Sequence, residues 1–494
     1  MERAQSIDTA KEKGPKPMEL SWRLMCVSVA SSTMSIQYGY NMWIVYSPTV
    51  LMQDFYNITI SEFMTDSSSQ IFLTAVTIAL FPLGGIFGAV AAGHILDRLG
   101  RKNSLMISNL LSVVSAILMG CSNLIHAYEY IMFTRLFLGI CTAILCSVVP
   151  IYLSEISPNS LKGSVMMISQ LFVTAGVLLA QILALREILG TKEGWPMLMG
   201  LIGIIPGTQV FLVPFYPESP RYLLIQKRDE DKAKKVLQRL RGTKDVNSEI
   251  EQLRQEDIFE KSEKQTNSLK VLWSQNLRWQ VITIIVLMCG QQLIGASAAY
   301  YYTERIYMST NVGINNVRYI SIATTVLLGL SSTTAMFLID IAGRRVLLLV
   351  GFGICTITSA VLAMSLHLQT SFPVMTYIST VAVDTYFVGY TLGPSPVPSV
   401  VTVELFFQSS RSSAYAIAEF VHWLLSFIMG VSFLHVETRL GAYSFLIFSS
   451  ISAATFVYIF KFLPETKKMT LLDIRKAMAV KTGRRIQVKG QMGK

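Results

Sequence analysis

The chain has 494 residues, of which 52% are hydrophobic and only 15% are charged. Soluble globular proteins carry about 25% charged residues, so this composition argues against an ordinary soluble enzyme and favours a membrane protein. The formal net charge of +11 fits nucleic-acid binding, an anionic membrane surface or an asymmetric membrane topology, and the positions of the charges must decide.

Twelve apolar stretches follow the polar first 21 residues, and each is long enough to cross a bilayer as a helix. They cover residues 22–44, 69–92, 104–122, 128–152, 163–186, 195–216, 279–303, 317–339, 345–367, 373–402, 412–434 and 442–463. We therefore predict an all-α membrane protein with twelve transmembrane helices. The six cysteines lie in apolar stretches without a CxxC pair, so no disulfide framework, metal site or cofactor is predicted.

The distribution of positive charge predicts the topology. An even number of spans places both termini on one side, and Lys and Arg mark the cytoplasmic side. With the termini inside, 36 of the 42 Lys and Arg residues fall in cytoplasmic segments, spread over several loops, which excludes a nucleic-acid face. The sequon Asn57-Ile58-Thr59 then lies in the long first external loop, so Asn57 is a predicted glycosylation site in a plasma-membrane protein.

The two halves of the chain repeat three signatures at nearly one spacing. Asp97–Lys102 matches Asp340–Arg345, Glu155 matches Glu404, and Pro217-Glu218-Ser219 matches Pro464-Glu465-Thr466, with offsets of 243 to 249 residues. Such a repeat implies a duplicated six-span unit with a site at the interface of the copies. The predicted organisation is a tail (1–21), a first half (22–216), a cytoplasmic linker with short helices (217–278), a second half (279–463) and a tail (464–494).

These residues carry a family resemblance that covers about residues 22–470. The chain resembles the facilitative glucose transporter family, the sugar porter branch of the major facilitator superfamily. The repeated signatures support it, together with Gln291-Gln292-Leu293 and Tyr300-Tyr301-Tyr302. Within the family it is most similar to the fructose-carrying class, because Ser399 follows Gly393–Pro398 where glucose-type members have Trp. The resemblance implies a facilitative uniporter that moves hexoses by alternating access.

Alternating access needs a latch that closes in one state and opens in the other. We predict a latch of ion pairs at the cytoplasmic ends of the spans, because orientation alone would not require acids at fixed spacing. Its predicted members are Asp97, Arg98, Arg101, Glu155, Glu218, Asp340, Arg344, Arg345, Glu404, Arg411 and Glu465. In this latch, Glu218 and Glu465 are expected to pair with the basic residues.

A sugar is neutral and rich in hydroxyls, so its site needs amide and hydroxyl side chains beside an aromatic surface. Polar side chains within apolar spans are costly and are therefore candidates. For a single glutamine the alternative is an interhelical hydrogen bond. With the resemblance, the predicted substrate-binding residues are Tyr38, Gln170, Gln291, Gln292, Ser297, Tyr390, Ser395, Ser399 and Trp423.

Glycine and proline predict the moving parts. A run of these residues in the tenth span cannot lie in an unbroken helix, so a gate is predicted there. A second gate is predicted at the external end of the seventh span. The predicted gating residues are Gly389, Gly393, Pro394, Pro398, Tyr300 and Tyr301, with a static kink as the alternative.

Several positions depart from the family pattern. Ser297, Ser426 and Leu328 stand where the family usually has Asn, and Tyr390 replaces a His of the fructose carriers. These changes keep glucose, urate or another small polar solute open as alternatives to fructose. Two intramembrane acids are also unexpected, Asp384 and Glu419, of which Glu419 has the i, i+3 spacing to pair with His422.

Coupling to protons is predicted to be absent. Proton-driven relatives pair a first-span Asp with a fourth-span Arg, whereas here Asn41 faces Arg135, and Asn does not titrate. A proton-coupled symporter is thus a remote alternative, as is a non-transporting sensor, because no long signalling tail follows Pro464. No phosphate loop, metal cluster or activated nucleophile predicts an enzyme. The expected partners are a small sugar and the lipid bilayer, with no nucleic acid and no obligate protein partner.

Overall fold

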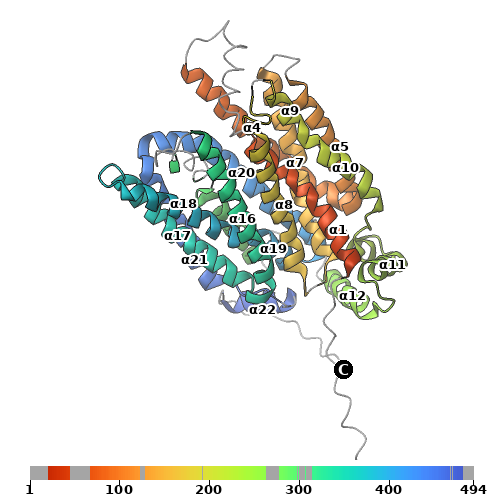
Figure 1. Cartoon of the computed structure of the whole chain (residues 1–494). Coiled ribbons are helices and arrows are strands. Elements are labelled where there is room, and N and C mark those ends of the chain that lie inside the picture. The colour runs from red at the N-terminus through yellow and green to blue at the C-terminus, as the bar shows by residue number, and fades with distance from the viewer. Residues whose placement is uncertain are drawn as a thin grey trace, which may run out of the picture.

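The computed structural model describes residues 21–44, 67–122, 128–158, 160–191, 193–262, 277–296, 299, 306–307, 314–467, 469 and 471–481, and these form helices without any strand. Two groups of long helices lie side by side (Figure 1), one from the first half of the chain and one from the second. Large side chains such as Phe133, Phe211, Phe337 and Ile357 are exposed on the outer faces, as expected where lipid is the solvent.

Nine helices of the described residues are long and apolar enough to cross a membrane. In the first half they are α4 (Ser67–Leu99), α5 (Arg101–Gly120), α7 (Tyr128–Ile156), α8 (Lys162–Leu183) and the segment α9 (Trp195–Gly200), η2 (Leu201–Gly203), α10 (Ile204–Leu212) and η3 (Val213–Phe215). In the second half they are α16 (Ile314–Ala342), α17 (Arg344–Leu368), α20 (Gln408–Leu440) and α21 (Ser444–Phe462), which η5 (Gly441–Tyr443) precedes.

The other three expected spans are interrupted, and none of them contains a single described helix that is both long and apolar enough to cross a membrane. The first is α1 (Trp22–Ser32), η1 (Thr33–Ser35) and α2 (Ile36–Trp43). The seventh begins as α14 (Arg278–Leu293) and then turns at Gly295, whose φ is +88°. The tenth consists of α18 (Val374–Leu392) and α19 (Val397–Leu405). Interruptions at membrane depth are tolerated where the backbone lines a protein cavity.

The two halves meet along two helix pairs, α4 with α20 and α8 with α16. Figure 1 shows α8 and α16 next to each other at the centre of the molecule. Several helices continue beyond the apolar stretches, as α4 does through Asp97 and α16 through Asp340. A helix keeps its own hydrogen bonds outside the bilayer, so hydropathy underestimates its length.

The linker between the halves forms a small helical unit of η4 (Tyr222–Gln226), α11 (Glu230–Arg241) and α12 (Asn247–Ser262). It has an apolar core of its own, with Ala233, Leu237 and Ile250 buried. Arg241 attaches this unit to the first half, because its guanidinium donates to the carbonyl of Ile156 (2.9 Å) at the end of α7. After the last span, α22 (Leu471–Lys481) packs below the second half, at the same end as α11 and α12 (Figure 1).

Candidate functional site

A cavity of about 160 Å³ lies between the two halves, bordered by the interrupted spans and by α8, α16 and α20. Both halves contribute to it, with Tyr38 and Gln170 from the first and Gln291 and His422 from the second. The structure brings eight of the nine predicted substrate-binding residues to its wall: Tyr38, Gln170, Gln291, Gln292, Tyr390, Ser395, Ser399 and Trp423. The ninth, Ser297, lies outside the described residues.

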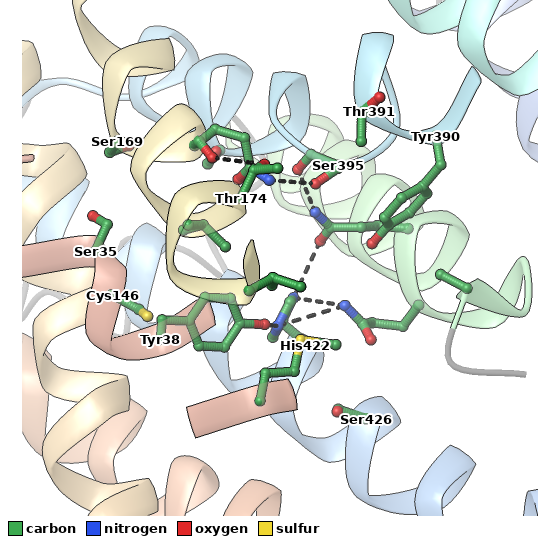
Figure 2. Close-up of a pocket in the computed structure, with 18 of the residues that line it drawn as sticks. Ser35, Tyr38, Cys146, Ser169, Thr174, Tyr390, Thr391, Ser395, His422 and Ser426 are labelled. Atoms are coloured by element: carbon green, nitrogen blue, oxygen red, sulfur yellow. Dashed lines mark hydrogen bonds between the residues drawn. The ribbon is translucent and has the colours of Figure 1, made fainter. Parts of the chain in front are cut away.

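His422 is the centre of the polar network in this cavity (Figure 2). Its Nδ1 lies 2.9 Å from Nε2 of Gln292 and 3.1 Å from Oε1 of Gln291, and its Nε2 lies 3.4 Å from the hydroxyl of Tyr38. Because Tyr38 belongs to the first half, this histidine connects the two halves. Sequence analysis did not place it in the site, although its position directly before Trp423 on a spanning helix was a usable signal.

The break in the tenth span presents Ser395 to both halves. Gln170 of α8 donates through Nε2 to Oγ of Ser395 (3.0 Å), and Gln291 of α14 donates to its backbone carbonyl (2.5 Å). A carbonyl beyond the end of a helix needs a partner of this kind. Hydrogen bonds through Ser395 and His422 therefore connect the three amides predicted for sugar binding in one network around the cavity.

The aromatic wall of the cavity is built around Trp423, which is 2% exposed. The ring of Tyr38 meets it edge-on with centroids 5.8 Å apart, and Phe81 does the same at 5.6 Å. The indole Nε1 donates to Oε2 of Glu419 (3.1 Å). Glu419 therefore bonds the residue at i+4, whereas the sequence suggested a pair with His422 at i+3.

The interruption of the tenth span is narrower than the sequence suggested. The helix breaks at residues 393–396, so Gly393 and Pro394 lie in the break. Pro398 lies in the first turn of α19, where a missing N–H costs little. Gly389 lies within α18, where a Cβ would run into Ile354 of α17, so this glycine allows close helix packing. Tyr300 and Tyr301 lie outside the described residues.

Three of the four departures from the family pattern lie at the cavity, and the fourth, Ser297, is outside the described residues. Leu328, Tyr390 and Ser426 line it, so an apolar chain, a phenol and a small hydroxyl face the space for a solute. Further polar wall residues that sequence analysis did not select are Ser35, Ser169, Thr174, Thr325 and Thr391. Small hydroxyl residues are common in spanning helices, so their type alone gives no signal.

Ion pairs cluster within each half at the span ends that the sequence predicts to be cytoplasmic. In the first half, Arg101 and Glu155 are both fully buried and lie 2.9 Å apart. In the second half, Arg344 bridges Asp340 (2.9 Å) and Glu404 (2.8 Å). Arg101–Glu155 and Arg344–Glu404 join helices that are more than 50 residues apart in sequence, so these contacts stiffen the halves.

Glu218 and Glu465 act differently from the sequence prediction, because they bond backbone rather than basic side chains. Glu218 accepts from the backbone N–H of Arg101 (3.1 Å) and Lys102 (3.2 Å). Glu465 accepts from the N–H of Arg344 (2.9 Å) and Arg345 (3.1 Å). An acid at a helix N-terminus satisfies unpaired donors and complements the helix dipole. Each half thus caps one helix, α5 or α17, from the end of its last span.

Contacts between the halves lie at the same ends of the spans as these ion pairs. Ser164 of α8 donates through its backbone N–H (2.9 Å) and its hydroxyl (2.5 Å) to Oδ2 of Asp340. Arg411 of α20 lies 3.9 Å from the carboxylate of Glu155. Of the other predicted latch members, Arg98 is exposed, and Arg345 donates to the carbonyl of Phe460 (2.7 Å). Neither Asp97 nor Arg98 forms an ion pair within the described part of the chain.

The remaining intramembrane charges lie away from the cavity wall. Asp384 accepts from the hydroxyls of Tyr307 (2.6 Å) and Thr324 (3.3 Å). Arg135 donates to the backbone carbonyl of Asn41 (3.4 Å) and lies over the ring of Phe81. Among the described residues, no cluster of His, Cys, Asp and Glu is suited to a metal ion.

Curated relatives are similar over nearly the whole chain. Solute carrier family 2, facilitated glucose transporter member 5 of Homo sapiens is 45% identical, with 90% of each chain covered. The Mus musculus protein of that name is 44% identical over 92% of this chain and 91% of the relative. Member 7 of Mus musculus is 41% identical over 90% and 88%.

Solved structures share the fold. The proton:xylose symporter XylE bound to 6-bromo-6-deoxy-D-glucose superimposes with a TM-score of 0.81, at 18% identity, over 94% of this chain and all of that one. Fold and cavity define a multi-pass membrane carrier of the major facilitator superfamily, with twelve transmembrane helices in two six-helix halves. The model of the family "Sugar (and other) transporter" matches residues 26–478, and the chain belongs to this family.

Proposed function

We propose that the protein is a facilitative uniporter for hexoses, with fructose as its main substrate. The observation that carries this proposal is the cavity between the halves, whose wall combines three amides, several hydroxyls and an indole. Uncharged donors and acceptors beside an aromatic ring suit a neutral polyol. Membership of the sugar transporter family and the similarity to facilitated glucose transporters support it.

The proposed mechanism is alternating access between residues 22–216 and residues 279–463. Substrate binds to residues of both halves, and the contacts at the cytoplasmic end open when the halves rock. The contacts named between the halves at this end are hydrogen bonds from Ser164 to Asp340 and a long ion pair (3.9 Å) between Arg411 and Glu155, and contacts so few can separate within a transport cycle. Breaks at Gly295 and at residues 393–396 provide the bending points for the gates.

The proposed topology places both termini, the linker 217–278 and the tail 464–494 in the cytoplasm of a plasma-membrane protein. The excess of Lys and Arg in these segments supports this orientation. The absence of proton coupling is proposed because Asn41 bonds Arg135 through its backbone carbonyl and has no titratable group.

A second solute is favoured by particular residues of the wall. Leu328 and Ser426 line the cavity where the family usually has Asn, and Tyr390 lines it in place of a His. Each lost hydrogen bond weakens sugar binding by about 0.5–1.5 kcal/mol. Glucose, urate or another small polar solute is therefore the alternative cargo.

The test is uptake of labelled fructose and glucose by the purified protein in liposomes without an ion gradient. We expect saturable fructose uptake that is lost in Gln170→Glu, which buries a charge, and is strongly reduced in Gln291→Ala. Gln238→Glu is the matched control, because that amide bonds Lys244 in the linker, far from the cavity. Folded protein that carries neither sugar would rule out the hexose assignment.

A further inference from the structure

We propose that Glu419 adapts the cavity to a positively charged, hydroxyl-rich solute, namely an amino sugar with a protonated amine. The inference rests on the proposed function, because it assigns a substrate class to the same cavity. It starts from one observation: among the described residues that line the cavity, Glu419 is the only Asp, Glu, Lys or Arg.

Glu419 is placed to receive a ligand. It lies on α20, and the residue is only 8% exposed. One carboxylate oxygen, Oε2, accepts from the indole of Trp423 (3.1 Å), which fixes the orientation of the group. The other oxygen, Oε1, has no hydrogen-bond partner in the described part of the chain, and the residue borders the cavity.

No basic side chain among the described residues compensates this carboxylate. The basic residues nearest to the interface are engaged elsewhere: Arg135 with the carbonyl of Asn41 and the ring of Phe81, and Arg411 with Glu155. A charge at membrane depth is costly unless it is paired. A solute ammonium would remove that cost by pairing with Oε1, and a neutral hexose would leave it in place.

The surroundings of Glu419 suit an ammonium with three donors. Oε1 can accept one of these N–H groups, and Trp423, whose indole orients the carboxylate, also lines the cavity. Tyr415 and Cys146 also line this side of the cavity. The amides Gln170, Gln291 and Gln292 then remain for the hydroxyls of the sugar ring.

The experiment compares cationic sugars with their neutral parents in liposomes that contain the purified protein. The probes are 1-amino-1-deoxyfructose with fructose, and glucosamine with glucose. We expect each amino sugar to be preferred over its parent, and to carry an inward current that the parent lacks. Glu419→Gln keeps an oxygen for the indole and removes the charge, so this preference should fall about tenfold, as for the loss of a charge-assisted bond. Asp384→Asn is the matched control, because it removes an acid from the membrane away from the cavity wall and should leave the preference unchanged.

The outcomes separate this inference from the proposed function. Fructose uptake without a preference for the amine, or a preference that survives Glu419→Gln, would overturn the inference and leave the uniporter intact. Uptake of amino sugars without neutral hexoses would support the inference and contradict the proposed substrate. Folded protein that takes up no probe contradicts both.

Discussion

His422 holds the amides of the second half and the phenol of the first half in one network. Replacing it with alanine removes three polar contacts and leaves space beside Trp423. We therefore expect His422→Ala to raise the KM for the transported sugar about tenfold or more, with less effect on the amount of folded protein. Uptake kinetics in liposomes measure this. Ser450→Ala, on the exposed face of α21, is the control. An unchanged KM would show that the network does not position the amides for substrate.

At this scale the sequence predicted residue types better than it predicted partners. Amide and aromatic residues in apolar spans indicated the cavity, because their burial in a membrane needs a reason. The pairing of Glu419 with Trp423 instead of His422, and the role of His422 itself, depend on the rotation of α20 against its neighbours. Sequence spacing places residues on one helix face without fixing which neighbour they meet.

Among the elements, α5 and α17 begin in the same way, each capped by a glutamate from the end of its half. Removing such a cap typically lowers the free energy of unfolding by about 1 kcal/mol. We expect Glu465→Ala to lower the midpoint of thermal unfolding in detergent, and Glu465→Gln to lower it less because one oxygen acceptor remains. Glu251→Ala, an exposed acid of the linker, should leave the midpoint unchanged. Equal midpoints for Glu465→Ala and the parent protein would contradict the capping role.

The start of α11 should respond to pH. Hydrogen bonds from the side chain and backbone N–H of Lys232 hold the pKa of Asp229 below its usual range. The folded pKa is therefore below the unfolded one, so the stabilisation exists above the unfolded pKa and is lost as the pH falls through the folded pKa. We expect Asp229→Ala to increase hydrogen exchange in α11 at neutral pH, with the difference vanishing in acid. Asp229→Asn keeps an oxygen for the cap but has no carboxyl to protonate. Hydrogen exchange in α11 of this variant should therefore not depend on the charge of residue 229.

Helix number and repeat were predictable, whereas helix ends were not. Hydropathy defines the bilayer-spanning part, and α4 and α16 continue past it because backbone hydrogen bonding does not stop at the membrane surface. The expected bond between Glu218 or Glu465 and a basic side chain is replaced by a bond to a helix start. The sequence showed that the two halves repeat the same spacing, but spacing does not distinguish a salt bridge from a helix cap.

For the whole molecule, the contact between Ser164 and Asp340 joins the two halves. Replacing both residues with cysteine should allow a disulfide to form under oxidation. We expect oxidation to stop sugar uptake and a reductant to restore it, because the halves must separate there in each cycle. The single-cysteine variants should keep their uptake after oxidation, although the chain has six cysteines of its own. Undiminished uptake by the cross-linked protein would exclude a rocking motion at this contact.

Gly100 and Gly343 should determine how much of the carrier folds, rather than how well each copy works. Both have positive φ (84° and 98°), and a Cβ at either position would meet the glutamate that caps the next helix. Neither residue borders the cavity. Variants at these positions should therefore fold poorly and be degraded, while each surviving copy works normally. In cells, Gly343→Val should lower the maximal uptake rate in proportion to the amount of folded protein and leave the KM unaltered. Such a variant would give fewer carriers rather than slower ones.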